Sequence, residues 1–292
     1  MRKVLRNIVQ EFFKFILRIK PLKRKLQDNL FAEKLAEASN SISIVSPLDT
    51  LSKIKETIAK EQQGCYMRFG DGDVFLLNKQ TDLYQKASEK LATEMKEAFT
   101  LSGDNIYKSL SIHSQAFGYE KEMYLGNHLV SDAYAAYLLK SSYPYFIGHQ
   151  IYSPVALHYT ATYHPALAND FLKVLKSKTF LFIGNQYIKE NILQRLFGEE
   201  TQIIGTPDNN AYNAIDEIEQ QVAPILANRT NFGVVIVAMG CSGRVLMKRL
   251  NLLKKNIFLF DFGSLLDGIN GVNSRTWLKK EELHYHLLMK DL

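Results

Sequence analysis

Cysteine is scarce in this sequence, since Cys65 and Cys241 are the only two and they lie far apart in the chain. A disulfide framework or a zinc site built from thiolates needs more cysteines at closer spacing, so both are excluded. This cysteine usage is typical of a reducing compartment, and we expect a cytoplasmic protein. His149, His158 and His164 lack the spacing of a helical zinc motif, and we expect them to be core or solvated side chains.

The sequence also lacks the short motifs of several large enzyme classes. It contains no Walker phosphate-binding loop, no kinase catalytic loop and no Gly-x-Ser-x-Gly nucleophile elbow. Internal repeats and low-complexity stretches are absent as well, which excludes repeat architectures. With 46% hydrophobic and 23% charged residues, the composition is that of an ordinary globular protein.

Positive charge is concentrated at one end of the chain. The net charge is +6, but residues 1–25 contain nine basic side chains and one acid, which leaves the other 267 residues with a net charge of −2. A protein that binds nucleic acid neutralises phosphates with basic residues on its folded body. We therefore expect no nucleic-acid partner.

Residues 1–40 are expected to form a basic, amphipathic, helical arm, and residues 41–292 a single α/β domain. In the arm, apolar residues recur at close to helical spacing, and charged residues interrupt any run long enough to span a bilayer. One interpretation places residues 1–25 on the anionic inner face of a membrane, where each basic side chain adds roughly 1 kcal/mol of attraction. The other packs the helix on the protein's own body or on a partner. The sequence leaves both interpretations open.

Apolar strands alternate with helices in the second half of the chain. These strands show no apolar–polar alternation, which is typical of parallel strands covered on both faces. We therefore predict an α/β fold with a Rossmann-like, mostly parallel sheet flanked by helices. Ligands of such sheets bind at the carboxyl ends of the strands. The expected strands are 65–69, 179–183, 201–205, 233–239 and 256–262, and the expected helices are 51–60, 84–100, 187–197, 214–226 and 244–253.

Two carboxylates follow the strand at 65–69. Asp71 and Asp73 lie beside glycines, with Gly70 before them and Arg68 at the strand end. Paired carboxylates are suitable ligands for a hard cation such as Mn²⁺ or Mg²⁺, and an adjacent arginine can pair with a phosphate. The alternative is a plain turn, because Asp and Gly are common turn residues.

A glycine-rich turn separates the strand at 233–239 from the helix that follows. Its residues are Gly240, Cys241, Ser242 and Gly243. Backbone N–H groups at a helix N-terminus can bind a diphosphate, and Ser242 can add a hydroxyl donor. A turn that needs glycine only for its geometry is the alternative.

Further candidates follow the other strand ends. Asp261 and Asp267 are candidates for a general base or a ribose contact, and Arg275 for stabilising a pyrophosphate. Asp208 and Asn209 follow another strand and can bind a base edge or sugar hydroxyls, or they can cap the next helix.

The segment from Arg68 to Asp73 resembles the Arg-x-Gly-Asp-Gly-Glu segment of the GT-D fold bacterial glycosyltransferases, which carries that family's Asp-x-Glu metal motif. Residues 204–213, 235–243 and 259–263 resemble the family's later motifs in the same order. The resemblance covers residues 45–278. It implies a Rossmann-like, single-sheet transferase that uses a UDP-sugar and Mn²⁺ or Mg²⁺.

By this resemblance, Asp71 and Asp73 would hold the metal and the donor diphosphate, and the turn from Gly240 to Gly243 would line the phosphate site. Two positions depart from the family pattern. Asp73 stands where glutamate is usual, which shortens the side chain by one methylene. Ser264 stands where many members have histidine, so no histidine role is carried over.

We therefore expect a glycosyltransferase, specifically a hexosyltransferase. It would move a sugar from a nucleotide-diphosphate sugar to a glycan, glycoprotein or lipid-linked acceptor in bacterial surface polysaccharide assembly. Two other classes stay open. Residues 238–243 with Asp261 come close to the fingerprint of an NAD-dependent oxidoreductase or a methyltransferase. The basic arm also suits a non-catalytic peripheral membrane protein.

Overall fold

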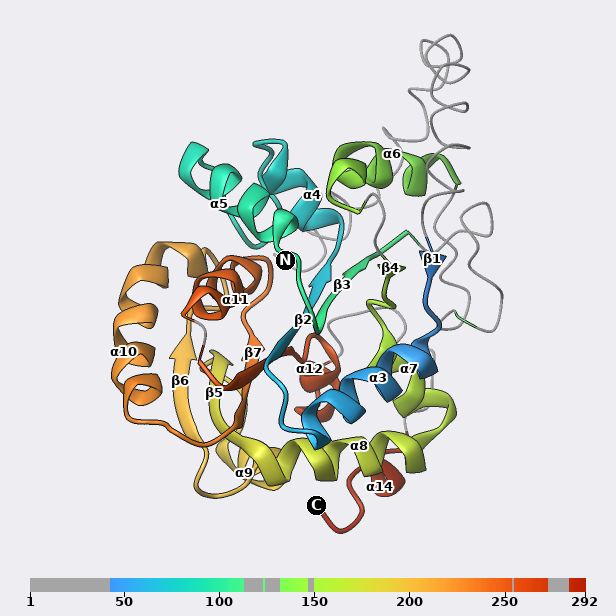
Figure 1. Ribbon diagram of the computed structural model, residues 1–292, viewed down its shortest axis with the longest axis vertical. Helices are drawn as coiled ribbons and strands as arrows, with labels where there is room; N and C mark the ends of the chain where they lie inside the picture. Colours follow the sequence, from blue (N-terminus) through green and yellow to red (C-terminus); the bar gives the residue numbers. More distant parts are fainter. Residues whose placement is uncertain (1–42, 113–122, 124–131, 147–149, 254, 273–283) are drawn as a thin grey trace, which may run out of the picture.

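A six-stranded sheet, parallel throughout, organises the chain (Figure 1). The structure is a computed structural model that describes residues 43–112, 123, 132–146, 150–253, 255–272 and 284–292. The strand order is β3-β2-β8-β7-β5-β6. The strands are β2 (Gly64–Phe69), β3 (Ile106–Leu110), β5 (Thr179–Asn185), β6 (Gln202–Thr206), β7 (Gly233–Ala238) and β8 (Ile257–Asp261). The predicted fold class is confirmed.

Alternate residues of the central strands enter two separate cores, one on each face of the sheet. In β7, Val235 and Val237 belong to one core, whereas Val234 and Ile236 belong to the other. All four are almost completely buried, which explains why the strand reads as an unbroken apolar run.

Helices cover both faces of the sheet (Figure 1). The first face carries α4 (Asp71–Leu77), α5 (Glu89–Thr100), α6 (Asp132–Ser142), α10 (Ile215–Ala227) and α11 (Ser242–Leu252). The second face carries α3 (Pro47–Ala59), α7 (Ala156–Tyr163), α8 (Pro165–Lys178), α9 (Glu190–Phe197), α12 (Leu265–Ile269) and α14 (Tyr285–Leu288). Two short strands, β1 (Ser43–Ile44) and β4 (Gln150–Ile151), pair in parallel beside β3.

The direction of the chain across the sheet reverses once in its second half. From β5 the chain passes through α9 to the outer strand β6, and then returns through α10 to β7 on the other side of β5. Helix α9 lies on the second face, whereas α10 and α11 lie on the first. The neighbouring strands β5 and β7 therefore form a topological switch point, where open α/β sheets bind ligands at the carboxyl ends.

Several helix boundaries differ from the prediction because a particular side chain caps the helix. Helix α3 begins at Pro47 because the Ser46 hydroxyl accepts the Asp49 N–H. Helix α5 begins at Glu89, not at residue 84, because Ser88 caps it; the preceding residues form a loop. Strand β3 was not predicted. The arm at 1–40 lies outside the described residues, and within the described part of the chain no helix is long and apolar enough to cross a membrane.

Lys108 is a buried cation on the outer strand β3. Its side chain is 4% exposed, and Nζ donates to the carbonyl oxygens of Phe99, at 2.7 Å, and Tyr145, at 2.8 Å. Phe99 lies in the last turn of α5, where carbonyl groups carry partial negative charge. Burial lowers the pKa of Lys108 to about 8.

Removing this amine changes the pH dependence of stability. The folded protein disfavours the charged form of Lys108, so the buried amine lowers the free energy of unfolding at pH values below 8. As the pH rises from 8 to 10.5, the ordinary pKa of lysine, this destabilisation disappears. Across that interval we expect wild-type protein to gain about 1–3 kcal/mol relative to Lys108→Met, measured by urea unfolding. The exposed control Lys90→Met should show the wild-type pH dependence. Parallel curves for wild type and Lys108→Met would contradict this account.

Candidate active site

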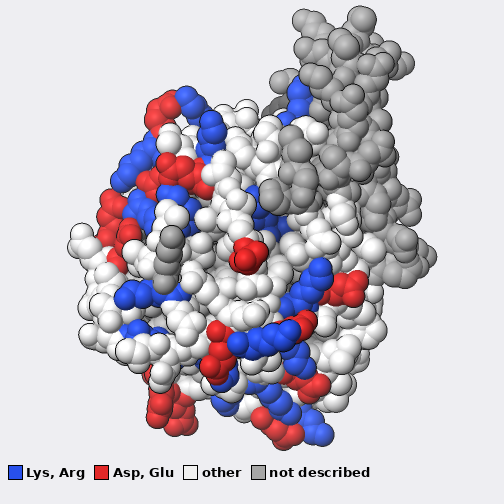
Figure 2. Space-filling view, in the orientation of Figure 1, with Lys and Arg blue, Asp and Glu red and all other residues white. Residues whose placement is uncertain are grey.

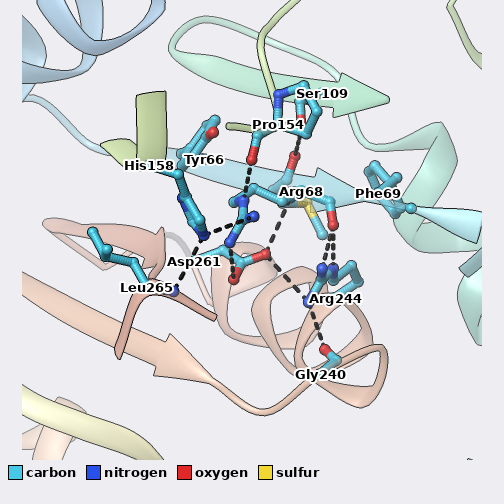
Figure 3. Close-up of polar contacts among 12 residues, drawn as sticks. Tyr66, Arg68, Phe69, Ser109, Pro154, His158, Gly240, Arg244, Asp261 and Leu265 are labelled. Atoms are coloured by element: carbon cyan, nitrogen blue, oxygen red, sulfur yellow. Dashed lines mark hydrogen bonds and ion pairs between the residues drawn. The ribbon is translucent and has the colours of Figure 1, made fainter. Parts of the chain in front are cut away.

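Four charged side chains meet below the carboxyl ends of β2, β7 and β8, and Figure 3 shows three of them, Arg68, Arg244 and Asp261. Arg68 lies in β2, Asp73 in α4, Asp261 at the end of β8 and Arg244 in the first turn of α11. Both carboxylates are 2% exposed. Two arginines and two aspartates balance in charge, which is the condition for keeping such groups buried. We call these four residues the charge cluster.

Arg244 connects the other members of the cluster. Its Nη1 lies 3.2 Å from Asp261 Oδ2, and its Nε lies 3.6 Å from Asp73 Oδ1. The guanidinium also donates to the carbonyl oxygens of Arg68 and Gly240. One side chain thus joins the ends of three strands, and these are the ends on which the sequence places its candidate residues.

Arg68 is held from several sides (Figure 3). Its Nε donates to the Pro154 carbonyl, its Nη1 lies 3.9 Å from Asp261 Oδ1, and its Nη2 lies 3.3 Å from His158 Nε2. His158 Nε2 also accepts the Leu265 N–H at 3.2 Å. The histidine is therefore a buried core residue, as expected. It positions Arg68 against the segment that follows β8.

Asp261 was predicted as a general base or a ribose contact, and its surroundings do not favour either role. The carboxylate receives the Arg68 backbone N–H at 3.2 Å and faces the guanidinium groups of Arg68 and Arg244. A buried carboxylate between two arginines has no open path to a substrate hydroxyl. Asp267 lies half-buried in the short helix α12, and Arg275 lies outside the described residues.

Asp71 and Asp73 do not lie on an isolated turn, because helix α4 begins at Asp71. Residues two apart on a helix point about 200° from one another, and the two side chains diverge. Asp71 is exposed, and its Oδ2 accepts the Tyr134 hydroxyl at 2.9 Å. Asp73 turns back, and its Oδ2 accepts the Gly70 N–H at 2.8 Å. Burial raises the pKa of Asp73 to about 6, although Arg244 and the Gly70 N–H favour its charged form.

The oxygens of these two carboxylates are chemically suitable for a divalent cation, but only Asp71 is placed to reach one in this structure, because Asp73 faces the charge cluster. Asp71 is reachable from solvent, and Asp73 Oδ1 is buried without a hydrogen bond. Among the described residues no group of three or more His, Cys, Asp or Glu side chains could hold a metal. A cation on Asp71 and Asp73 would therefore need further oxygen ligands from a substrate, as phosphate groups provide.

The glycine turn has a shape that only glycine adopts easily. Gly240 has φ +57°, and a Cβ built on it would meet nothing within 4 Å, so the space above the turn is open. The Ser242 hydroxyl is buried and donates to Gln85 Oε1 at 3.0 Å. Cys241 is half-buried, and burial raises the pKa of its thiol, which stays protonated. Ser242 therefore binds the protein itself in this structure, whereas the backbone of Gly240 faces open space.

The loop at 79–88 lies against both the glycine turn and the segment after β6. Gln85 Oε1 accepts from the Tyr212 N–H as well as from the Ser242 hydroxyl. Asn210 has φ +52°, and its side-chain carbonyl accepts the Lys86 N–H at 2.9 Å. Of the predicted loop residues, Asp208 and Asn209 are exposed beside this contact and face solvent.

Sequence reasoning missed Arg244, Tyr134 and Gln85. Arg244 carried a usable signal, because a cation in the first turn of a helix opposes the helix dipole and requires nearby acids. Tyr134 and Gln85 carried none, since each reaches its partner across a long stretch of sequence. Across the face drawn in Figure 2, described acidic and basic side chains are interspersed, in line with the near-neutral body.

Arg244→Met would leave two buried carboxylates short of a partner. We expect the free energy of unfolding to fall by about 3–5 kcal/mol, measured by urea denaturation at neutral pH. Lys248→Met, in the same helix, removes an ion pair whose Glu97 partner is half exposed, and it should cost about 1 kcal/mol or less. Equal losses in the two variants would show that Arg244 does not stabilise the site.

The sequence matches a known family model, and the fold is similar to that of solved structures. The model of the glycosyltransferase GT-D fold family matches residues 66–268, more than half of the chain. A selenomethionine-substituted structure of the domain of unknown function 1792 has a TM-score of 0.56 and 20% identity, and the alignment covers 80% of this chain and 82% of that chain. Another structure of that domain, described as a distinct glycosyltransferase fold, gives 0.55 and 20%, with 78% and 81% covered.

A third structure, a new glycosyltransferase from Streptococcus sanguinis, has a TM-score of 0.56 and 18% identity, with 86% of this chain and 93% of that chain covered. No curated protein matches the sequence significantly. At these identities the solved structures show a shared fold, and the family model identifies the family. The region that the family model matches begins inside β2 and ends inside α12, so it includes the whole charge cluster and the glycine turn. The chain belongs to the glycosyltransferase family with the GT-D fold.

Proposed function

We propose that the protein transfers a hexose from a nucleoside-diphosphate sugar, with UDP as the nucleotide, to a glycan, glycoprotein or lipid-linked acceptor in bacterial surface polysaccharide assembly. One observation carries the proposal. The charge cluster holds the exposed Asp71 and the open turn at Gly240 at the same edge of the sheet, after β2 and β7, the two strands that flank β8. A positively polarised backbone and a cation both stabilise a bound diphosphate, and this edge offers a candidate for each.

The glycine turn would bind the diphosphate through its backbone. Within the turn, the Gly243 and Arg244 N–H groups already donate to the Gly240 and Cys241 carbonyls, so the phosphate would bind the N–H groups before them, at residues 240–242. Helix α11 starts there, and the partial positive charge of a helix N-terminus favours phosphate. The open space above Gly240 leaves room for phosphate oxygens to approach. A branched residue at Gly240 would strain the left-handed backbone, so lost affinity and lost stability could not be separated there.

Asp71 would hold Mn²⁺ or Mg²⁺, and Asp73 would join it by turning out of the charge cluster. When bound, the ion would neutralise the charge that develops on the diphosphate leaving group. The Tyr134 hydroxyl orients Asp71. Burial raises the pKa of Tyr134, and the Asp71 carboxylate raises it further, so the phenol stays protonated and donates. Arg244 fixes Asp73, and Asp267 is the candidate base for the acceptor hydroxyl.

A thermal-shift panel tests the donor class. UDP-hexose with Mn²⁺ should stabilise the wild-type protein by about 2.7 kcal/mol at a hundred times its dissociation constant. NAD and S-adenosylmethionine should give no shift, which would separate sugar transfer from the oxidoreductase and methyltransferase alternatives. A response to NAD or S-adenosylmethionine alone would overturn the proposal.

Asp71→Asn tests the cation in the same assay. Because Asp71 is exposed, its removal should change the free energy of unfolding by about 0.5 kcal/mol or less, while the Mn²⁺-dependent shift with UDP-hexose is lost. Asp104→Asn, an exposed aspartate before β3 at the opposite edge of the sheet, is the matched control and should respond as wild type does. An unchanged Mn²⁺ response in Asp71→Asn would rule out the metal assignment.

The basic arm would hold the enzyme on the inner face of the cytoplasmic membrane, close to a lipid-linked acceptor. This proposal rests on the charge of residues 1–25. Full-length protein should sediment with anionic vesicles at low salt and be released at high salt, since headgroup attraction is screened over about 8 Å at physiological ionic strength. Protein lacking residues 1–25 should stay in the supernatant. If the full-length protein also stays there at low salt, the arm has another role.

A further inference from the structure

Tyr187 is an exposed aromatic residue at the carboxyl end of β5. Its side chain is 66% exposed, although the neighbouring Ile188 is buried. Scattered exposed apolar residues need no explanation on a protein surface. This one is unusual in its position, because it follows the strand that borders the topological switch point.

The backbone of Tyr187 is held on both sides. Its N–H donates to Asn185 Oδ1 at 2.9 Å, and its carbonyl accepts Asn270 Nδ2 at 3.4 Å. Asn270 Oδ1 also accepts the Lys189 N–H at 3.1 Å. The ring is therefore presented to solvent from a fixed backbone, which lowers the entropy that is lost when a ligand packs on it.

The register of the sheet places Tyr187 and the glycine turn after the carboxyl ends of neighbouring strands. Gly184 in β5 pairs with Ala238 in β7, and this is the last pair of the two strands before each chain segment leaves the sheet. Tyr187 lies three residues after Gly184, and Gly240 lies two residues after Ala238. Neighbouring strands are about 4.8 Å apart, so the two segments leave the sheet side by side, at the edge where a nucleotide would bind.

The position of the charge cluster indicates on which side of the glycine turn each part of a bound nucleotide would lie. On the β8 and β2 side of Gly240 lie the buried arginines and aspartates and, at the surface, Asp71 with Tyr134. That side offers the candidate cation ligands, which belong next to the phosphates and the transferred sugar. The nucleoside is then directed to the other side of the turn, toward β5.

We propose that Tyr187 is a stacking surface for the planar base of the nucleotide donor. The inference rests on the proposed function and adds the side of the glycine turn on which the base lies. Aromatic rings bind bases through their flat faces, with little dependence on base identity. Tyr187 would therefore contribute affinity for the nucleotide and leave the choice of base to neighbouring polar groups.

Isothermal titration with Mn²⁺ and either UDP or inorganic pyrophosphate tests this inference. Stacking on an aromatic ring is worth about 1–3 kcal/mol per base, so Tyr187→Ala should weaken UDP binding about 5- to 150-fold. Pyrophosphate lacks the base, and its affinity should change less than about twofold in the same variant. Tyr187→Phe keeps the ring and should bind UDP within about threefold of wild type. Tyr163→Ala, at the end of α7 and 43% exposed, is the matched control and should bind both ligands as wild type does.

The possible failures are distinguishable. If wild type binds pyrophosphate and UDP but Tyr187→Ala binds UDP equally well, the stacking inference is wrong and the donor class stands. Equal weakening of UDP and pyrophosphate would show that Tyr187 acts on the shape of the turn, which also overturns stacking. If wild type binds no UDP at all, both the proposed function and the stacking inference are wrong.

Discussion

The charge cluster is the interaction on which the site depends. Asp73 and Asp261 are both 2% exposed, and burying carboxylates at that depth is costly unless a guanidinium lies beside them. Arg244 serves both of them and also binds two backbone carbonyls. Because these acceptors come from β2, the glycine turn and β8, the three strand ends cannot move independently. The cluster therefore determines how the exposed surface above it is shaped.

Above this buried layer, the groups expected to contact substrate are held through their backbones. Gly240 adopts a left-handed conformation and is fixed by its carbonyl. Tyr187 is fixed by two asparagines. Asp71 is fixed by Tyr134 from another helix. A site organised in this way is prepared before the donor arrives, so less binding energy is lost in ordering the protein.

Much of the fold could be predicted from sequence, because strands buried on both faces must be continuously apolar. Strand β3 was missed for the same reason, since Lys108 and Ser109 interrupt its apolar pattern while being buried. The positions of the glycine turn and the acidic segment followed from parallel topology, which gathers strand ends at one edge. The sequence could not reveal that Asp73 and Asp261 face inward. Their partner Arg244 is far away in the chain from Asp73, and only the folded structure brings them together.

Gly263 shows how strongly the cluster limits the divergence of this sequence. Its φ is +68°, and a Cβ at this position would lie 1.3 Å from Arg68 Nη1. Any side chain there would have to displace the guanidinium, which is confined by Asp261, Pro154 and His158. A glycine that touches no substrate thus becomes as intolerant of change as a substrate-binding residue. A shorter side chain at position 68 would make room at position 263 but would not relieve the left-handed backbone there, so Gly263 is constrained both by its neighbour and by its own conformation.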